Sequence, residues 1–231
     1  MLLNFDKNAK TVKGQKRGVM TGVLYLAPFN LSGVNVCPHA SAGCAAACLN
    51  TAGMGIFKAV QKVRIDKTKA LFADRNAFIM LLKAEIWNAM GRAKKAGMEL
   101  AIRLNGTSDL PWENMFPMGD FPKVKFYDYT KNPIRMKKYL DGGMPNNYSL
   151  TFSLSETNKP IALQILKRGG NVAMVFATKD EKKLPKEYMG YKVVNGDRDD
   201  LRFKDKQNVI VGLKMKGKAM YDETGFVQPC K

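Results

Sequence analysis

The sequence is short of several residues and motifs on which large classes of enzymes depend. It has one histidine, His39, which argues against a Ser-His-Asp hydrolase and against a metal site built from several histidines. The spacings of a Walker A loop and of a GxGxxG dinucleotide turn are absent. The cysteines also lack the paired two-residue knuckles that are typical of zinc fingers.

Acidic residues are scarce as well, and their shortage leaves the chain strongly positive. Asp and Glu number 20 against 38 Lys and Arg, which gives a formal net charge of +18 at pH 7. One interpretation is a solubilising surface. The other is affinity for nucleic acid, because contacts with phosphate groups release counterions. The basic residues are spread along the whole chain, so neither the surface nor the choice between DNA and RNA can be specified.

Long apolar runs are missing, and so is a basic, apolar signal segment at the start. We therefore expect a cytoplasmic protein with no membrane partner, in which clustered cysteines bind metal rather than form disulfides. The 231 residues contain no linker, repeat or low-complexity block. This predicts a single α/β domain over residues 1–231, with a basic N-terminal segment over 1–22 that is mobile or lies at an edge.

Hydrophobic periodicity predicts strands that alternate with helices. The main expected helices cover 58–74 and 75–96, and Trp87 in the second is expected in the core. This alternation favours a parallel sheet with right-handed helical crossovers. We predict a partial TIM-like barrel of about seven strands, with a doubly wound open sheet as the alternative. The expected strands cover 23–28, 99–105, 123–129, 147–154, 170–177, 191–195 and 209–216.

Three of the four cysteines, Cys37, Cys44 and Cys48, fall within twelve residues. The alanines at 45–47 predict a helical turn that places Cys44 and Cys48 on one face, with Cys37 in the preceding loop. Cys230 supplies a fourth thiolate if the last segment of the chain returns to this region. Four thiolates suit a 4Fe-4S cluster, with structural zinc as the alternative and buried thiols without metal as the plain explanation.

Polar residues recur where the predicted strands end. The carboxyl ends of strands build the site in barrels and open α/β sheets, so these side chains are candidates for binding a small polar ligand. Ordinary loop and cap residues are the structural alternative. No catalytic residue can be assigned. The ligand-binding candidates are His39, Arg103, Asn105, Thr107, Ser108, Asp109, Tyr127, Asp128, Lys131, Ser153, Glu156, Asp197 and Lys214.

Several of these motifs resemble a family of phage-encoded proteins of the gene product 88 type. The resemblance covers most of the chain. It implies a phage origin, and hence a location in the host cell cytoplasm, but it implies no mechanism. The matching stretches are residues 35–39, 43–44, 48–53, 103–109, 126–131 and 196–197.

The predicted architecture also resembles radical SAM enzymes, in which three cysteines after the first strand of a partial barrel hold a 4Fe-4S cluster. The resemblance implies that Cys37, Cys44 and Cys48 are ligands and that the open iron binds S-adenosylmethionine near residues 103–109. The spacing of these cysteines is wider than in that family, and the Gly-Gly-Glu motif is missing. Cys230 would close the fourth iron site, so radical-SAM-like activity is expected only if three cysteines ligate the cluster.

The sequence thus predicts a phage-encoded iron–sulfur protein with a radical-SAM-like barrel. Its cluster would lie where the strands end, and a basic surface would contact nucleic acid. The alternative is a zinc-stabilised nucleic-acid-binding or host-modulating module without catalysis. The oligomeric state does not follow from the sequence.

Overall fold

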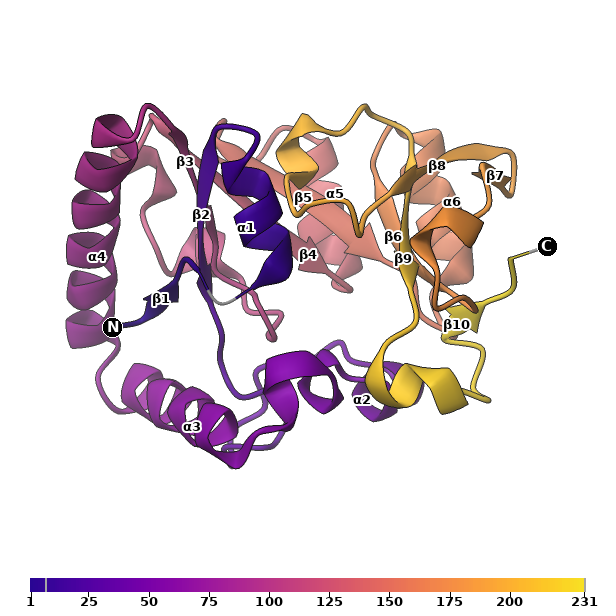
Figure 1. The fold of residues 1–231 in the computed structure, drawn as a ribbon, viewed down its shortest axis with the longest axis horizontal. Coiled ribbons are helices and arrows are strands. Elements are labelled where there is room, and N and C mark those ends of the chain that lie inside the picture. Colours follow the sequence, from indigo (N-terminus) through magenta and orange to yellow (C-terminus); the bar gives the residue numbers. More distant parts are fainter. Residues whose placement is uncertain (7, 231) are drawn as a thin grey trace. The chain divides into compact units, whose positions relative to one another are not determined.

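The computed structural model describes residues 1–6 and 8–230 and shows a mixed α/β protein (Figure 1). Ten strands form a mostly parallel sheet, and β1 and β7, at the two ends of the strand order, do not pair in the described part of the chain. The parallel α/β class is therefore confirmed, but the sheet does not close into a barrel. The chain forms two compact units, described separately below: residues 1–38, 57–128 and 144–149, and residues 39–56, 129–143 and 150 onwards.

The first unit contains strands in the order β1-β2-β3-β4. Antiparallel pairing joins β1 to β2, whereas β2, β3 and β4 pair in parallel. Val19, Val23 and Ile102 in these strands are fully buried, as expected of branched side chains in a sheet that is covered on both faces. The bounds are β1 (Leu3–Asn4), β2 (Val19–Leu24), β3 (Glu99–Arg103) and β4 (Val124–Thr130).

Three α-helices belong to this unit: α1 (Ala9–Gln15), α3 (Lys58–Ala73) and α4 (Arg75–Lys95). Asp74 separates the last two, because its side chain caps α4 by accepting the backbone N–H of Ala77 at 2.9 Å. Two 3₁₀ helices, η3 (Trp112–Asn114) and η4 (Met118–Asp120), lead from β3 to β4. The chain thus crosses from one parallel strand to the next through helical segments, as the alternating pattern predicts.

The long helix α4 has one buried and one exposed face. Phe78, Leu82 and Ile86 recur every fourth residue and are buried, and α4 packs against β3. Trp87 is 56% exposed, so the expectation that it lies in the core is wrong. It follows Ile86 by one residue, which turns its side chain about 100° away from the buried face. Its ring still contacts Phe121, with 5.1 Å between ring centroids.

The second unit contains strands in the order β5-β6-β9-β8-β7, all parallel except β7. The short β10 pairs in parallel with the end of β6. The bounds are β5 (Tyr148–Ser153), β6 (Val172–Phe176), β7 (Glu187–Tyr188), β8 (Tyr191–Asn195), β9 (Ile210–Lys214) and β10 (Val227–Gln228). The α-helices are α2 (Ala42–Ala46), α5 (Pro133–Leu140) and α6 (Lys159–Lys167). The 3₁₀ helices are η1 (Leu49–Thr51), η2 (Gly53–Ile56), η5 (Glu181–Lys183), η6 (Arg202–Lys204) and η7 (Gly217–Tyr221).

The first strand of the parallel series lies earlier in the chain than the sequence pattern predicts. It covers Val19–Leu24 rather than 23–28, because Val19 through Val23 pair with β3. Pro28 has no N–H to offer a neighbouring strand. The basic segment over residues 1–22 does lie at an edge through β1, and it also contains α1 and the start of β2. No helix among the described residues has the length and apolar character needed to cross a membrane.

Asn147 links the loop before β4 to the start of β5. Its side-chain Nδ2 donates to the carbonyl oxygens of Met118, Phe121 and Val124 at 2.9 to 3.1 Å. Its own carbonyl accepts the N–H of Phe126 at 2.8 Å. One side-chain amide therefore satisfies several backbone acceptors in the loop before β4.

We predict that Asn147→Ala lowers the free energy of unfolding by about 1–3 kcal/mol, because it leaves buried carbonyl groups without donors. Urea denaturation of the full chain measures the change. The neighbouring Asn146 is exposed, and Asn146→Ala should stay within about 0.5 kcal/mol of the original chain. Equal effects of the two substitutions would contradict this assignment.

Candidate functional site

The helix that carries Cys44, α2, is displaced from the predicted position. Ser41 caps it by accepting the N–H of Cys44 at 3.2 Å, and the helix ends at Ala46. Cys48 has a non-helical backbone and caps the next helix, η1, where its Sγ accepts the N–H of Asn50 at 3.5 Å. The prediction that Cys44 and Cys48 share one helical face is therefore wrong, because Cys48 begins a new helix instead of continuing the first.

Glu156, in the loop that follows β5, holds the start of α2. Its two carboxylate oxygens accept the Ser41 hydroxyl and the Gly43 N–H, each at 2.7 Å. The first N–H groups of a helix have no partner within it, and a carboxylate satisfies both their hydrogen bonding and their positive dipole end. Glu156 thus positions the segment that carries Cys44.

The C-terminal segment also packs against α2. Ala47, Ala219 and Phe226 form a small buried cluster, and Cys44 lies against it. A Cβ atom on Gly43 would lie 2.8 Å from the Phe226 Cβ and would overlap the Thr224 hydroxyl. Only glycine permits this approach. The last part of the chain therefore returns to the cysteine-bearing helix, and Cys230 follows two residues after β10.

Asp222 shapes this C-terminal segment. Its carboxylate accepts the Thr224 hydroxyl at 2.7 Å and the Val227 N–H at 2.8 Å. Burial raises the pKa of Asp222, but the hydrogen bonds from Val227 and Thr224 outweigh it and leave this pKa below its ordinary value. A hollow of about 410 Å³ lies beside this turn. It is lined by Ala46, Ala47, Lys218, Tyr221, Asp222, Glu223 and Thr224.

The loop that follows β9 reaches the segment of Cys48. The N–H of Lys218 donates to the Thr51 hydroxyl at 3.1 Å, and that hydroxyl donates to the Cys48 carbonyl at 2.8 Å. Gly217, with φ of 55°, lies so close to Thr51 that a Cβ would be 2.7 Å from its carbonyl oxygen. The strand-end loops after β5 and β9 therefore hold α2 and η1 respectively.

Cys37 lies in the first unit, where the loop after β3 holds it. Its Sγ accepts the N–H of Phe29 at 3.4 Å and donates to the Thr107 carbonyl at 3.6 Å. The N–H of Asp109 donates to the carbonyl of Val36 at 2.8 Å. The segment 103–109, which contains five of the ligand-binding candidates, is thus in direct contact with a cysteine loop.

The polar side chains of that same loop bond mainly to one another. Asp128 is 0% exposed and accepts the Asn105 N–H at 2.7 Å and the Tyr148 hydroxyl at 3.1 Å. The Asn105 side chain accepts the Ser108 hydroxyl and the Leu110 N–H, and it donates to the Leu110 carbonyl. Three ligand-binding candidates, Asn105, Ser108 and Asp128, therefore fix the shape of the loop.

Asp197, in the loop after β8, binds both Lys214 and Lys216 at the end of β9. One carboxylate oxygen accepts the Lys214 N–H at 2.8 Å, and the other pairs with the Lys216 ammonium at 2.5 Å. The Asp197 side chain is almost fully buried, and its ion pair with Lys216 lies at the carboxyl end of β9. Asp197 and Lys214 are both sequence candidates, and they meet through the backbone N–H of Lys214.

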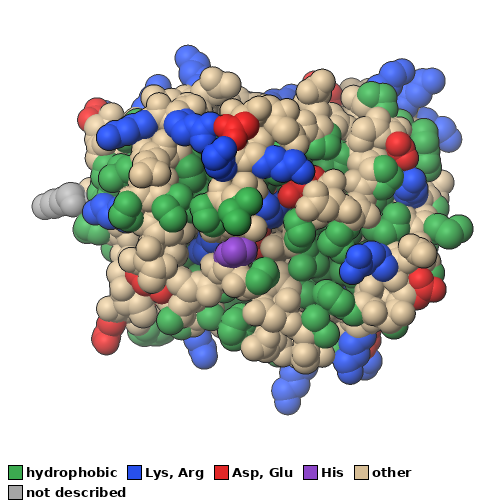
Figure 2. All heavy atoms as spheres, turned by 180° about the vertical axis from the view of Figure 1, so that it is seen from behind, with side chains coloured by type: hydrophobic (Ala, Val, Ile, Leu, Met, Phe, Trp, Pro, Cys, Tyr) green, Lys and Arg blue, Asp and Glu red, His purple; other side chains and the backbone are tan. Residues whose placement is uncertain are grey.

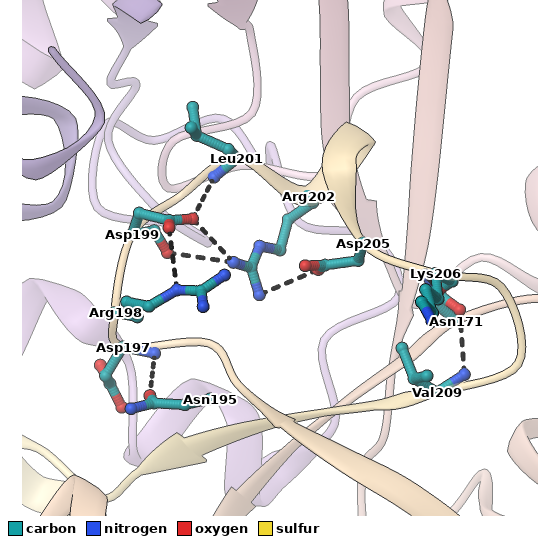
Figure 3. Close-up of polar contacts among 10 residues, drawn as sticks. All are labelled: Asn171, Asn195, Asp197, Arg198, Asp199, Leu201, Arg202, Asp205, Lys206 and Val209. Carbon is teal, nitrogen blue, oxygen red and sulfur yellow. Dashed lines mark hydrogen bonds and ion pairs between the residues drawn. The ribbon is translucent and has the colours of Figure 1, made fainter. Parts of the chain in front are cut away.

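A buried ion-pair cluster lies directly after Asp197 (Figure 3). The Arg202 side chain is 1% exposed and lies between Asp199 at 3.2 Å and Asp205 at 3.1 Å. Burial lowers the pKa of Arg202, but the nearby Tyr129 and three aspartates outweigh it, so the pKa is raised and the guanidinium stays charged. The sequence analysis did not single out Arg202, because one arginine in a charged loop carries no distinguishing signal.

The other candidates have varied surroundings. The Lys131 ammonium lies 5.5 Å from the centre of the Phe226 ring, which places it near the C-terminal segment. Tyr127 is fully buried, whereas His39, the single histidine in Figure 2, is exposed.

Three further candidates serve the backbone. Arg103 donates to the Asn105 carbonyl at 3.2 Å, and the Thr107 hydroxyl donates to the Leu26 carbonyl at 2.5 Å. Ser153 accepts the Asn158 amide through its carbonyl.

The cysteines suit a soft metal chemically, but the described side chains do not assemble a ligand set. Within residues 1–6 and 8–230, no three His, Cys, Asp or Glu side chains lie close enough together to hold one metal ion. All four cysteines are half-buried, and none of them forms a disulfide. The Sγ atoms of Cys37 and Cys48 each accept a backbone N–H bond.

The basic residues do not gather into one patch on the face drawn in Figure 2, where Lys and Arg side chains are scattered among apolar ones. Most of them lie at the surface, and acidic side chains are fewer, in line with the net charge of +18. On this face the positive charge is therefore distributed rather than concentrated in one region.

The fold and the site together define an α/β protein with an open, mostly parallel sheet, in which strand-end loops hold cysteine-bearing segments. The family described as gene product 88 matches residues 1–230. The chain belongs to this family of phage gene products, which confirms the resemblance seen in its motifs. No curated protein and no solved structure gives a significant match.

We predict that Gly43→Ala lowers the free energy of unfolding by about 1–3 kcal/mol, because the added methyl group displaces Thr224 and Phe226 from α2. Thermal unfolding followed by circular dichroism measures this. Gly119 in η4 is the matched control, since a Cβ there meets nothing within 4 Å. Gly119→Ala should leave the unfolding temperature nearly unchanged. A harmless Gly43→Ala would show that the C-terminal segment is not packed on α2.

Proposed function

We propose that this chain is a phage-encoded iron–sulfur protein of the host cytoplasm, whose 4Fe-4S cluster is bound by Cys37, Cys44 and Cys48, with Cys230 as the fourth ligand. One observation carries the proposal. Within the first unit the loop after β3 contacts the segment of Cys37, and within the second unit the loops after β5 and β9 contact the segments of Cys44 and Cys48. In parallel α/β sheets this end of the strands is where ligands bind.

The chemistry of the donors supports iron–sulfur rather than harder metals. Thiolates are the ligands of Fe–S clusters, and hydrogen bonds to sulfur tune such clusters. Cys37 and Cys48 accept such bonds from Phe29 and Asn50. Because no three metal-binding side chains converge in the described residues, the proposal requires that the cysteine segments adjust when the cluster is inserted.

The number of ligands decides the role of the cluster. With three cysteine ligands, one iron would stay open to a small molecule such as S-adenosylmethionine. With Cys230 as the fourth, the cluster would be structural or would sense redox state. We infer a partial TIM-like barrel as the setting, since β2, β3 and β4 are parallel and follow one another in order, as β5 and β6 do. Because a fold hosts many functions, this likeness to radical SAM enzymes assigns no reaction.

We predict that the full chain, purified without oxygen, is brown and absorbs in the charge-transfer region of iron–sulfur clusters. Cys44→Ser should lower the iron content at least tenfold, because a serine hydroxyl binds iron poorly. Ser41 caps α2, so its replacement by cysteine would disturb the helix and is not a suitable control. Ser153→Ala is the control instead, and it should keep the iron. Cys230→Ser decides the ligand count: lost cluster means four ligands, and retained cluster means three.

The zinc alternative gives a different result in the same experiment. A colourless protein with bound zinc that depends on the same cysteines would replace the iron–sulfur proposal with a zinc-stabilised module. A colourless protein without metal, after anaerobic reconstitution with iron and sulfide, would leave the cysteines as structural thiols and would overturn the proposal.

We also propose that the basic surface contacts nucleic acid, on the evidence of the net charge of +18. Binding to single- and double-stranded DNA and to RNA should weaken steeply with salt, by about tenfold or more between low and physiological concentrations. Filter binding over a salt series measures the slope, and the acetylated protein, which lacks lysine charges, is the control. Affinity that does not change with salt, or no retention at all, would contradict this part of the proposal.

A further inference from the structure

The exposed face of α4 carries an apolar stripe. Met80 is 72% exposed, and Trp87, seven residues further on and 56% exposed, lies on the same face. Leu81, 48% exposed, flanks this face. Single exposed apolar residues are ordinary at protein surfaces, but a contiguous group of large ones marks an interaction site. The stripe belongs to the first unit.

The spacing along this stripe matches the seam of a helix pair. Residues 77, 80, 84, 87 and 91 recur at alternating intervals of three and four, as the core positions of a coiled coil do. Small residues, Ala77, Ala84 and Gly91, occupy one position of each heptad, and all three are exposed. A Cβ on Gly91 would meet nothing within 4 Å. Small residues allow another backbone to approach closely, while Met80 and Trp87 supply apolar area.

We propose that the occupant of this stripe is a second copy of the chain, with the two α4 helices antiparallel about a two-fold axis at Ala84. In that register Ala84 faces Ala84 of the second copy, and Ala77 faces its Gly91. Trp87 then lies beside Met80 of the second copy, and Met80 lies beside its Trp87. Small residues therefore meet small ones at the closest points, and the large exposed side chains fall beside apolar partners. Such a pairing is closed, since each copy uses the same surface.

Charge favours the same register. Asp74 caps the start of α4, and Lys94 lies in its last turn. The two-fold pairing places Asp74 near the basic last turn of α4 in the second copy, at both ends of the interface. Antiparallel helices also bring opposite dipole ends together. These attractions are local, whereas two chains of +18 repel each other as whole molecules.

The repulsion between the two copies and the apolar contact between them respond differently to salt. Added salt screens the long-range repulsion between the copies but affects the apolar seam little, so the dimer should tighten as salt rises. An acidic partner helix or an anionic membrane would behave in the opposite way, because salt would weaken its attraction to a basic chain.

The 21 residues of α4 span about 30 Å, and one helix pair covers less than the roughly 800 Å² per partner of standard interfaces. The dimer is therefore weak.

Sedimentation of the full chain over a wide range of protein concentrations, at low and high salt, tests the proposal. The expected result is a monomer–dimer equilibrium that shifts toward dimer at high salt. Ala84→Arg places a charge at the centre of the seam and should weaken the dimer at least tenfold. Ala59→Arg is the matched control, because Ala59 is exposed on α3 and lies outside the stripe; it should leave the dimer unchanged.

Tryptophan fluorescence gives a second readout that does not depend on size. Trp112 is fully buried, so a blue shift that appears as concentration rises reports on Trp87. A chain that stays monomeric at every concentration and salt would overturn the proposal. It would also be overturned by a dimer that Ala84→Arg leaves intact, or by association that salt weakens.

Discussion

The carboxylate of Glu156 is the interaction on which the cysteine region of the second unit depends. The helix α2 has five residues, too few to be stable alone. It forms because Glu156 accepts a hydroxyl and a backbone N–H at its start, and because Phe226 and Ala219 cover its other residues. A residue at the end of a strand thus fixes the position of Cys44 more than the alanine run around it does.

Polar side chains at another strand end also hold a cysteine segment in place. Polar side chains there were candidates for a ligand, yet Asn105, Ser108 and Asp128 bond chiefly to one another and to the loop backbone. Their use is to shape the loop that contacts Cys37 through Thr107. Strand-end polarity in this protein therefore supports the cysteine segments directly. These contacts fix the loops around the cysteine segments without defining a substrate.

Much of the fold could be predicted from the sequence, because long periodic segments specify their own structure. The bounds of α3 and α4 differ from prediction by a residue at most, and the strands from 99 onward lie where alternation placed them. The position of Cys48 could not be predicted, because no sequence pattern shows that its sulfur caps the next helix, η1. Trp87 was assigned to the core by its helical context alone, although its position around α4 relative to Phe78 and Leu82 already pointed outward. Short strands such as β10 depend on tertiary pairing and carry no local pattern.

The central claim is that thiolates from this region bind an iron–sulfur cluster, and the most direct test is the iron and acid-labile sulfide content per chain after anaerobic purification. The account predicts about four of each, as in a cubane cluster. Iron and sulfide that are both absent after anaerobic reconstitution would contradict it, whether or not zinc is bound in their place.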